Sequence, residues 1–283
     1  MKYGALYRLG ADRLTAAGIE EAALDARLLL ESVCHTDRNT LLVHGDTEVE
    51  QAQEQRYLDG IKARACHVPL QYITGVQEFM GLSFAVNEHV LIPRQDTEIL
   101  VEEAMRELHD GMRILDMCTG SGCILLSLLR YSNDCAGTGV DISAAALAVA
   151  AENAAALGLE ADFREGDLFA GLERGSRFDM LVSNPPYIRT DVIPGLMEEV
   201  RLHEPLSALD GTADGLEFYR RISREAKPYL NGGAGVFLEI GFDQGADVRR
   251  ILEDAGYDRV EIVKDYAGHD RVVRCIWQEK ENV

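Results

Sequence analysis

A chain of 283 residues is long enough for about two domains and a sizeable hydrophobic core. Apolar residues make up 47% and charged residues 27%, which is typical of globular proteins and excludes a disordered, fibrous or membrane-embedded composition. Asp and Glu outnumber Lys and Arg by 48 to 28, so the net charge is −20. A broad basic face for nucleic acid is therefore not expected, because contacts to phosphate dominate such binding. Small molecules and proteins are the expected partners.

The chain shows no targeting, membrane or metal-binding pattern. Its first residues, MKYGALYRLG, do not resemble a secretory signal. The best apolar run, ILLSLL at 124–129, is far shorter than the roughly 18 residues that suggest a membrane span. The six cysteines form no CxxC pair and no Cys/His cluster with zinc spacing, so no metal is expected. These features predict a cytoplasmic protein with reduced, mostly buried thiols.

Residues 1–68 have helical periodicity in every patterned stretch. The stretches 22–33 and 48–68 space apolar side chains such as Leu28 at helical intervals, with charged residues between them. Pro69 ends the region, because the residue before a proline is pushed out of the α conformation. We expect short amphipathic helices that form a small bundle.

Residues 69–92 differ from this pattern and are expected to connect two domains. EFMGLSFAV at 78–86 sets a glycine among alternating aromatic and small residues, which is typical of a β-hairpin. After Pro93, the stretch 96–108 has an apolar face and begins with Asp96, which we expect to cap a helix.

Residues 93–283 alternate short apolar runs with helical patterns. Such alternation predicts βαβ units and a mainly parallel, doubly wound sheet. The expected architecture is an α/β fold with a helical bundle at 1–68, a β-hairpin connector at 69–92 and an α/β domain at 93–283. The expected strands are RILDMC, GTGVD, FDMLVS, VFLEIG and two runs near 259–263 and 271–277.

A glycine-rich stretch, DMCTGSG at 116–122, lies directly between the apolar run RIL and a helical pattern. Glycines at a strand-to-helix junction allow the backbone to approach a ligand and leave helix N-terminal amides pointing at it. A dinucleotide fingerprint requires a third glycine where Leu125 stands, so NAD is disfavoured. A tight turn without a ligand is the alternative.

One acidic residue ends the next expected strand, GTGVD, and another follows a further strand-like run in GDLF. Asp141 lies where one carboxylate can accept hydrogen bonds from both hydroxyls of an adenosine ribose. Its alternative role, capping the following helix, is already available to Ser143. Asp167 is a candidate partner for an adenine amine and Phe169 for the adenine face, although an aromatic residue after a strand equally suits a core.

The most informative motif is NPPY at 184–187, at the end of the apolar run FDMLVS. Two prolines fix φ and supply no N–H, so a rigid backbone carbonyl has no competing donor beside it. The Asn184 oxygen and that carbonyl offer two acceptors for the hydrogens of a planar NH₂ group, and Tyr187 offers a flat wall. The motif indicates recognition of an amide or aminopurine nitrogen, with a turn of no chemical role as the alternative.

In this order, the glycine-rich turn, the strand-end acid and NPPY resemble S-adenosylmethionine-dependent N-methyltransferases. The wider sequence resembles the HemK/PrmC family of glutamine N5-methyltransferases that act on peptide chain release factors. The resemblance covers nearly the whole chain, including its helical N-terminal part. It is carried by QYITGVQEFMGLSFAVNEHVLIPRQDTEILVE, DMCTGSGCILL, FDMLVSNPPYI, EPLSALDGTADGLEFYRRI and DYAGHDRVV.

The resemblance implies a Rossmann-like, seven-stranded methyltransferase sheet with S-adenosyl-L-methionine over the C-terminal strand ends. The glutamine of a Gly-Gly-Gln loop in a class 1 release factor would enter beside NPPY. The implied cofactor residues are Cys118, Thr119, Gly120, Ser121, Gly122, Asp141, Phe169 and Asn184. The implied catalytic residues are Asn184, Pro185, Pro186 and Tyr187. Ile92–Arg94 and Glu98 also match family positions near the cofactor.

Two residues depart from the family pattern. Cys118 stands where many members have Gly, so any need for positive φ must be relaxed or the loop adjusted, which puts cofactor affinity in question. Gln95 replaces a frequent Pro and is expected to affect only loop stiffness.

Three other functions stay open. One is glutamine methylation in a ribosomal protein, although EPLSALDG and DYAGHDRVV are more similar to the release-factor branch. Another is adenine N-methylation in nucleic acid, since a flipped adenine amine fits the same two acceptors; the net charge of −20 counts against it. The third is a non-catalytic binding module, against which the intact NPPY counts.

The expected partner is a class 1 release factor, with no direct contact to nucleic acid or membrane. Its Gly-Gly-Gln loop works inside ribosomal RNA and should sit on a basic surface, so the acid excess of this chain is expected to steer docking. Residues 1–68 contain no chemical motif and are the expected docking surface, with a purely structural role as the alternative. We expect a monomer.

Overall fold

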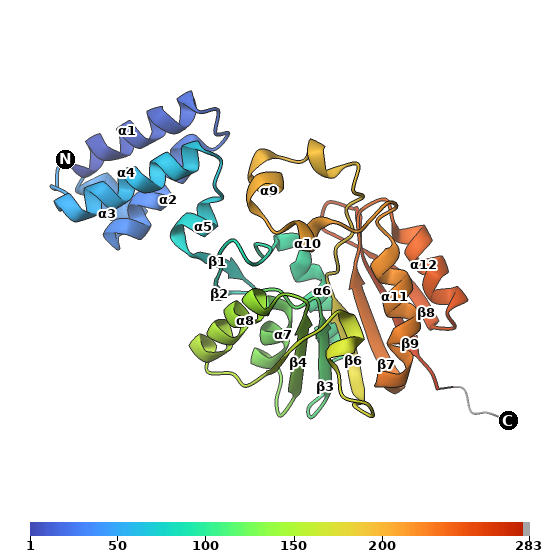
Figure 1. The fold of residues 1–283 in the computed structure, drawn as a ribbon. Helices are drawn as coiled ribbons and strands as arrows, with labels where there is room; N and C mark the ends of the chain where they lie inside the picture. The colour runs from blue at the N-terminus through green and yellow to red at the C-terminus, as the bar shows by residue number, and fades with distance from the viewer. Residues whose placement is uncertain (280–283) are drawn as a thin grey trace. The chain divides into compact units, whose positions relative to one another are not determined.

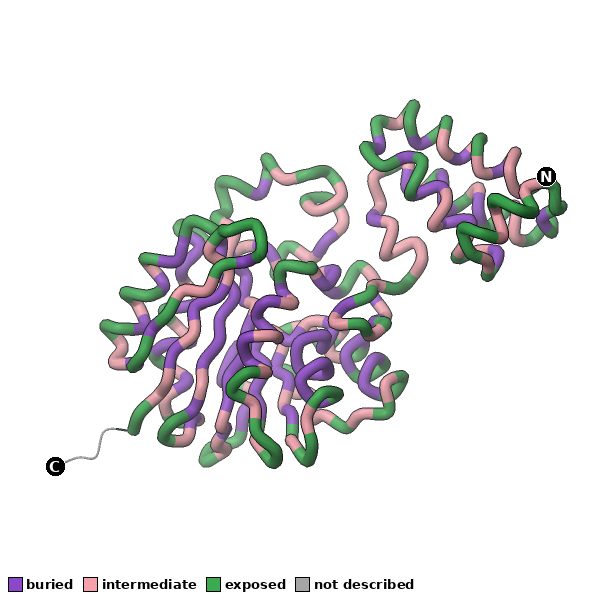
Figure 2. Tube along the Cα trace, turned by 180° about the vertical axis from the view of Figure 1, so that it is seen from behind, coloured by how far each residue is buried: buried purple, intermediate pink, exposed green. Residues whose placement is uncertain are grey.

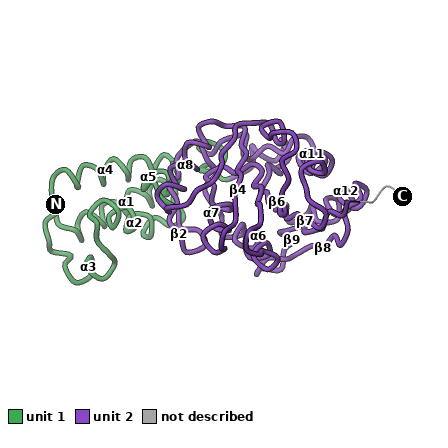
Figure 3. Tube along the Cα trace, turned by 90° about the horizontal axis from the view of Figure 1, so that it is seen from below, with its two compact units in different colours: residues 1–76, 197–203 green, residues 77–196, 204–283 purple. Residues whose placement is uncertain are grey.

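The computed structural model describes residues 1–279, and its chain divides into two compact units (Figure 3). The first unit holds residues 1–76 together with 197–203, and the second holds 77–196 and the chain from 204 onward. The division after residue 76 therefore runs through the stretch that the sequence assigns to the connector. A late segment, 197–203, belongs by its contacts to the first unit.

The first unit is a bundle of helices around an apolar core. Leu6, Leu29 and Tyr57 are completely or almost completely buried in it. The helices are α1 (Tyr3–Ala16), α2 (Ala22–Cys34), α3 (Arg38–Val43), α4 (Gln51–Ala65), α5 (Leu70–Thr74) and α9 (Glu198–His203). The helices expected within 22–33 and 48–68 are present as α2 and α4.

One buried guanidinium holds α9 in this unit. Arg64 of α4 donates through Nε to Asp25 Oδ2 at 2.7 Å and pairs through Nη2 with Glu199 Oε2 at 2.8 Å. Two carboxylates compensate one buried charge, and removing a partner from such a pair is costly. The attachment of α9 therefore depends on residues that lie far apart in the sequence.

The second unit is built on a seven-stranded sheet of order β5-β4-β3-β6-β7-β9-β8 (Figure 1). The strands from β5 to β7 pair in parallel, and β9 runs antiparallel to both β7 and β8. The predicted mainly parallel α/β sheet is confirmed. The strands are β3 (Arg113–Met117), β4 (Ala136–Asp141), β5 (Asp162–Glu165), β6 (Phe178–Ser183), β7 (Leu230–Glu239), β8 (Asp258–Lys264) and β9 (Asp270–Trp277).

Helices cover both faces of the sheet, because both faces of its central strands are apolar. Ile114 of β3 packs into one core cluster and the next residue, Leu115, into the other. Figure 2 shows the central strands buried along most of their length. The first face is covered by α6 (Gln95–Arg106), α7 (Cys123–Arg130) and α8 (Ala144–Leu157), and the second by α11 (Glu217–Glu225) and α12 (Gly245–Asp254). The short helix α10 (Leu206–Leu209) lies in the connection that follows β6.

The strand order reverses beside β3, whose neighbours are β4 on one side and β6 on the other. Connections from β3 and β6 therefore leave the sheet in opposite directions and open a crevice beyond the carboxyl ends of the strands. Asp141 ends β4, and the predicted site residues Cys118 and Asn184 come directly after the ends of β3 and β6.

The hairpin between the helical region and the sheet consists of β1 (Val76–Phe79) and β2 (Leu82–Ala85). Its turn residues, Met80 and Gly81, both have positive φ, as tight hairpins require. Glu98 Oε1 accepts a hydrogen bond from the Met80 amide at 2.6 Å. Glu98 therefore anchors the hairpin to α6.

The expected capping role of Asp96 is wrong. Helix α6 begins at Gln95, so Arg94 occupies the N-cap position, and no side chain caps the helix. Asp96 lies inside the first turn, where its charge suits the helix dipole, and its Oδ2 pairs with Arg271 Nη2 at 2.9 Å.

Candidate active site

A cavity of about 470 Å³ lies at the carboxyl ends of β3, β4 and β6. This volume lies within the range of sites for small molecules and cofactors, about 300–1,000 Å³. Its wall includes residues before α6, the glycine-rich loop, the ends of β4 and β5, part of NPPY and the segment 205–208. The sequence signals that follow successive strands therefore meet at one place.

The glycine-rich stretch reaches this cavity through residues 118–121. Cys118, Thr119, Gly120 and Ser121 line it, whereas Gly122 forms the N-cap of α7 with φ of +77°. A Cβ at position 122 would lie 3.2 Å from side-chain carbons of Ala150 and Leu126. The loop is thus closely packed from behind and open toward the cavity.

Cys118 adopts a left-handed conformation with φ of +62°. Of the two alternatives expected for a cysteine here, the relaxed need for positive φ is therefore wrong, because Cys118 keeps the backbone conformation that glycine would favour. Such a conformation costs a residue with a Cβ about 1–2 kcal/mol. Burial raises the pKa of the Cys118 thiol well above its ordinary value, so the side chain is neutral.

Asp141 joins the end of β4 to the loop that follows β3. Its Oδ2 accepts from the Gly120 amide and its Oδ1 from the Ser143 amide, each at 2.9 Å. Burial raises the pKa of Asp141, and these backbone amides oppose the rise. Each carboxylate oxygen retains further lone-pair capacity, so the group suits a pair of hydroxyls in the cavity. Ser143 caps α8 by accepting from the Ala146 amide at 3.2 Å, as predicted.

The residues after β5 are arranged differently from the expectation for an adenine pocket. Asp167 lines the cavity and pairs with Arg221 Nη1 at 2.9 Å. Phe169 does not line it: the side chain is buried in the core and stacks on Tyr229, with ring centroids 5.4 Å apart. The chain turns at Leu168, whose φ is +52°, so Leu168 faces the cavity and Phe169 faces the core. The aromatic residue that lines the cavity is Phe218.

NPPY brings one side-chain amide to the cavity wall, where Thr97 of α6 also lies and holds it. Asn184 Nδ2 donates to the hydroxyl of the buried Thr97 at 3.3 Å, which leaves Asn184 Oδ1 as an acceptor. Asn184 and Pro186 line the cavity, whereas Pro185 and Tyr187 do not. The Tyr187 hydroxyl donates to Glu239 Oε1 at 3.3 Å.

Sequence reasoning missed Asn153, which lies behind the glycine-rich loop. Its Nδ2 donates to the carbonyls of Ser121 and Ala85 at 2.9 and 3.1 Å, and its Oδ1 accepts from the Ala85 amide at 2.7 Å. One buried side chain thus links α8, the hairpin and the loop. A polar residue next to the buried Ala154 on the inner face of an alanine-rich helix was the available signal.

Residues before α6 also contribute to the cavity. Pro93 and Arg94 line it, whereas Ile92 is buried and Glu98 is committed to the hairpin. Arg94 pairs with the buried Glu204, at the start of the segment that forms another wall. Of the residues that the resemblance placed near the cofactor, Pro93 and Arg94 therefore line the cavity, whereas Ile92 and Glu98 support the structure around it.

The residues that line the cavity fit S-adenosyl-L-methionine. A carboxylate faces the cavity beside a glycine loop, and the wall is largely apolar with Phe218 available for a base. Within residues 1–279 no group of three or more His, Cys, Asp or Glu side chains could hold a metal ion. The same part of the chain contains no helix both long and apolar enough to cross a membrane. Fold and cavity together define an S-adenosylmethionine-dependent methyltransferase.

Comparison with known proteins gives the family. Residues 5–75 match the PrmC N-terminal domain and residues 95–199 the methyltransferase small domain. The chain is 44% identical over 257 residues to a release factor glutamine methyltransferase of Clostridium acetobutylicum, covering 89% of this chain and 90% of that one. It is 46% identical over 264 residues to the Moorella thermoacetica protein of the same name, covering 92% and 93%. The chain belongs to the release factor glutamine methyltransferase family.

A solved structure supports the fold assignment independently. A methyltransferase from Pyrococcus furiosus superposes with a TM-score of 0.54 at 18% identity, covering 81% of this chain and all of that one. At this identity the likeness concerns the fold alone.

The position of Asn153 leads to a prediction on cofactor binding. Asn153→Ala leaves the Ser121 carbonyl and both Ala85 backbone groups without their partner, at a cost of about 1–3 kcal/mol. We expect the dissociation constant for S-adenosylmethionine, measured by calorimetry, to rise about tenfold. Glu152→Ala, an exposed neighbour on the same helix, is the control. Unchanged affinity in Asn153→Ala would show that the side chain holds only the hairpin.

The strained Cys118 leads to a second prediction. Cys118→Ala removes the sulfur and keeps the strain, whereas Cys118→Gly removes both but adds about 0.4–1 kcal/mol of chain entropy to the unfolded state. Relief of about 1–2 kcal/mol of backbone strain in the folded state should outweigh the stability lost to that chain entropy. We expect urea unfolding to show Cys118→Gly at least as stable as Cys118→Ala, with cofactor affinity no weaker. A clearly more stable alanine variant would contradict the strain.

Proposed function

We propose that this chain transfers the methyl group of S-adenosyl-L-methionine to the N5 amide nitrogen of the glutamine in a Gly-Gly-Gln loop of class 1 peptide chain release factors. The observation that carries the proposal is the hydrogen bond from Asn184 Nδ2 to Thr97, which presents Oδ1 as an acceptor in the cavity wall. The names of the close relatives support this substrate.

The cofactor half of the site would use the loop 118–121 and the carboxylate of Asp141, which accepts the ribose hydroxyls. Asp167 would accept a hydrogen bond from the exocyclic amine of adenine, and Leu168 and Phe218 would form apolar walls beside the base. When bound, S-adenosylmethionine supplies a methyl group on a sulfonium, which is already a strong leaving group. What this chain must supply is therefore the position and polarity of the acceptor.

An amide nitrogen is a poor nucleophile because its lone pair is delocalised into the carbonyl. In our proposal, Asn184 Oδ1 and the Pro185 carbonyl accept both hydrogens of the substrate NH₂ group and stabilise positive charge that develops on nitrogen. Holding reacting atoms about 3–3.5 Å apart can lower a barrier by several kcal/mol, and preorganised polar groups by about 3 kcal/mol more. The extra proton leaves readily after alkylation, so no strong general base is needed.

The helical region at 1–68 is the proposed docking surface for the release factor. The net charge of −20 favours attraction to a protein surface that otherwise lies against ribosomal RNA. Because the substrate acts on ribosomes, we place the reaction in the cytoplasm.

Mass spectrometry of a purified release factor, incubated with the chain and S-adenosylmethionine, tests the reaction. We expect one added methyl group on the glutamine of the Gly-Gly-Gln loop, and none in a release factor in which that glutamine is replaced by alanine. Methylation of a ribosomal protein or of adenine in nucleic acid, with the release factor unmodified, would contradict the proposed substrate.

The two halves of the site should separate in kinetics. Asn184→Ala removes the amide acceptor, so we expect kcat to fall about 10²–10³-fold while cofactor affinity changes little. Asp141→Ala removes the ribose acceptor and a partner of the Gly120 amide, so the dissociation constant for S-adenosylmethionine should rise about 10–100-fold. Methylation by Asn184→Ala at the wild-type rate would overturn the assignment of the pocket.

A further inference from the structure

Two buried polar side chains, one at the end of β7 and one just after it, contact the last residue of NPPY. Glu239 ends the strand and is 1% exposed, and Gln244 follows five residues later at 8%. Glu239 Oε1 accepts from the Tyr187 hydroxyl at 3.3 Å, while Gln244 Nε2 donates to the Tyr187 carbonyl at 3.0 Å. Tyr187 is therefore held at both its ring end and its backbone. Neither Glu239 nor Gln244 lines the cavity.

Both polar atoms of the Gln244 carboxamide bond to the backbone, and Oε1 also accepts from the Tyr219 hydroxyl at 3.5 Å. Its Nε2 also donates to the Gly215 carbonyl at 3.2 Å, and its Oε1 accepts from the Gly241 amide at 2.9 Å. Gly215 has φ of +72°, and a Cβ there would lie 2.4 Å from the Tyr187 carbonyl oxygen. The close approach that fixes Tyr187 therefore depends on glycine at position 215 and an amide side chain at position 244.

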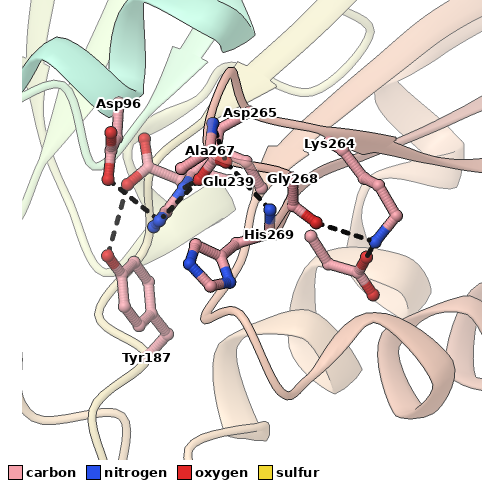
Figure 4. A network of polar contacts seen from close by, with 10 residues as sticks. Asp96, Tyr187, Glu239, Lys264, Asp265, Ala267, Gly268 and His269 are labelled. Carbon is pink, nitrogen blue, oxygen red and sulfur yellow. Dashed lines mark hydrogen bonds and ion pairs between the residues drawn. The ribbon is translucent and has the colours of Figure 1, made fainter.

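Glu239 lies where the supports of both ends of NPPY converge. Its carboxyl accepts a hydrogen bond from the Tyr187 hydroxyl. The hydroxyl of Thr97, which accepts from Asn184, also lowers the pKa of Glu239. Burial raises the pKa of Glu239 to about 7, and Thr97, Arg271 and Tyr187 oppose the rise, in that order. In Figure 4 the Tyr187 ring directs its hydroxyl toward the Glu239 carboxyl.

Arg271 supplies positive charge close to this buried carboxyl and is itself held in place. Its Nη2 pairs with Asp96 at 2.9 Å and Asp265 at 3.1 Å, and its side chain is 13% exposed. Asp265 also accepts from the amides of Ala267 and His269, so the turn between β8 and β9 is rigidly bonded (Figure 4). The stretch DYAGHDRVV, which the sequence singles out without a role, therefore places a positive charge that acts on Glu239 and on the Tyr187 hydroxyl.

We propose that Glu239 and Gln244 are positioning residues of the glutamine pocket: they fix the Tyr187 ring and backbone, and through them the acceptors at Asn184 and Pro185, without touching the substrate. This inference rests on the proposed function of NPPY. A misplacement of about 1 Å by a change away from the reacting atoms can cost about 100-fold in rate. Loss of either support therefore lowers turnover more than it lowers cofactor binding, because the cofactor loop is anchored separately through Asn153 and Asp141.

The test measures kcat for methylation of a release factor alongside the dissociation constant for S-adenosylmethionine. Glu239→Ala should lower kcat about 10–100-fold with cofactor affinity within about twofold of wild type. Glu239→Gln should restore most of the rate, because its amide oxygen still accepts from the Tyr187 hydroxyl. Tyr187→Phe should lower kcat, and adding Glu239→Ala to it should lower kcat little further.

Gln244→Met, which matches the length of the side chain and removes its hydrogen bonds, should lower kcat in the same selective way. Asp243→Asn, an exposed neighbour in the same loop, is the matched control and should leave both quantities unchanged. If Glu239→Ala does not fold, Tyr187→Phe and Glu239→Gln still decide between the outcomes.

Wild-type kcat in Tyr187→Phe, or an equal loss in Glu239→Gln and Glu239→Ala, would overturn the role of Glu239. A loss of cofactor affinity that accounts for the whole effect would do the same, since a general structural defect has that signature. The wild-type reaction reports separately on the proposed function. If the wild-type enzyme leaves the glutamine unmodified, the proposed function fails, and the positioning role in a glutamine pocket fails with it.

Discussion

The hydrogen bond from the Gly120 amide to the Asp141 carboxylate joins the end of β4 to the loop after β3, and the cofactor half of the site depends on it. It forms because β3 and β4 pair in parallel, so their carboxyl ends lie next to each other. The crevice opens there because the strand order reverses beside β3. The carboxylate fixes the loop through one oxygen and the start of α8 through the other, while facing the cavity. One acid thus shapes the pocket and offers it a polar partner.

The site has two halves, and each is supported by different residues behind the cavity wall. Asn153 connects the glycine-rich loop to the hairpin, whereas Glu239 and Gln244 support Tyr187. Thr97 orients Asn184 so that its oxygen is left as the acceptor. Among the described residues, the Asn153 side chain bonds only to Ala85 and Ser121 and shares no hydrogen bond with Thr97, Glu239 or Gln244. Binding of cofactor and the rate of transfer can therefore be altered separately.

Much of the fold followed from periodicity, because alternating strands and helices leave a clear apolar pattern. The acids and NPPY at the strand ends could also be predicted as site residues, since polar residues directly after buried strands stand out. The features that could not be predicted from the sequence depend on tertiary contacts. Leu168 turns the chain so that Phe169 enters the core, and Asn153 reveals its partners only once the hairpin has folded onto α8. Glu239 carried the same strand-end signal as Asp141, but the position of Tyr187 was needed to interpret it.

A crystal structure of the chain with S-adenosylhomocysteine and a Gly-Gly-Gln peptide is the most direct test of the central claim. We expect the glutamine side-chain nitrogen to donate one hydrogen bond to Asn184 Oδ1 and the other to the Pro185 carbonyl, with the ribose hydroxyls on Asp141. A glutamine amide bound away from Asn184, or a ribose that does not touch Asp141, would contradict the account of how this site holds its two substrates.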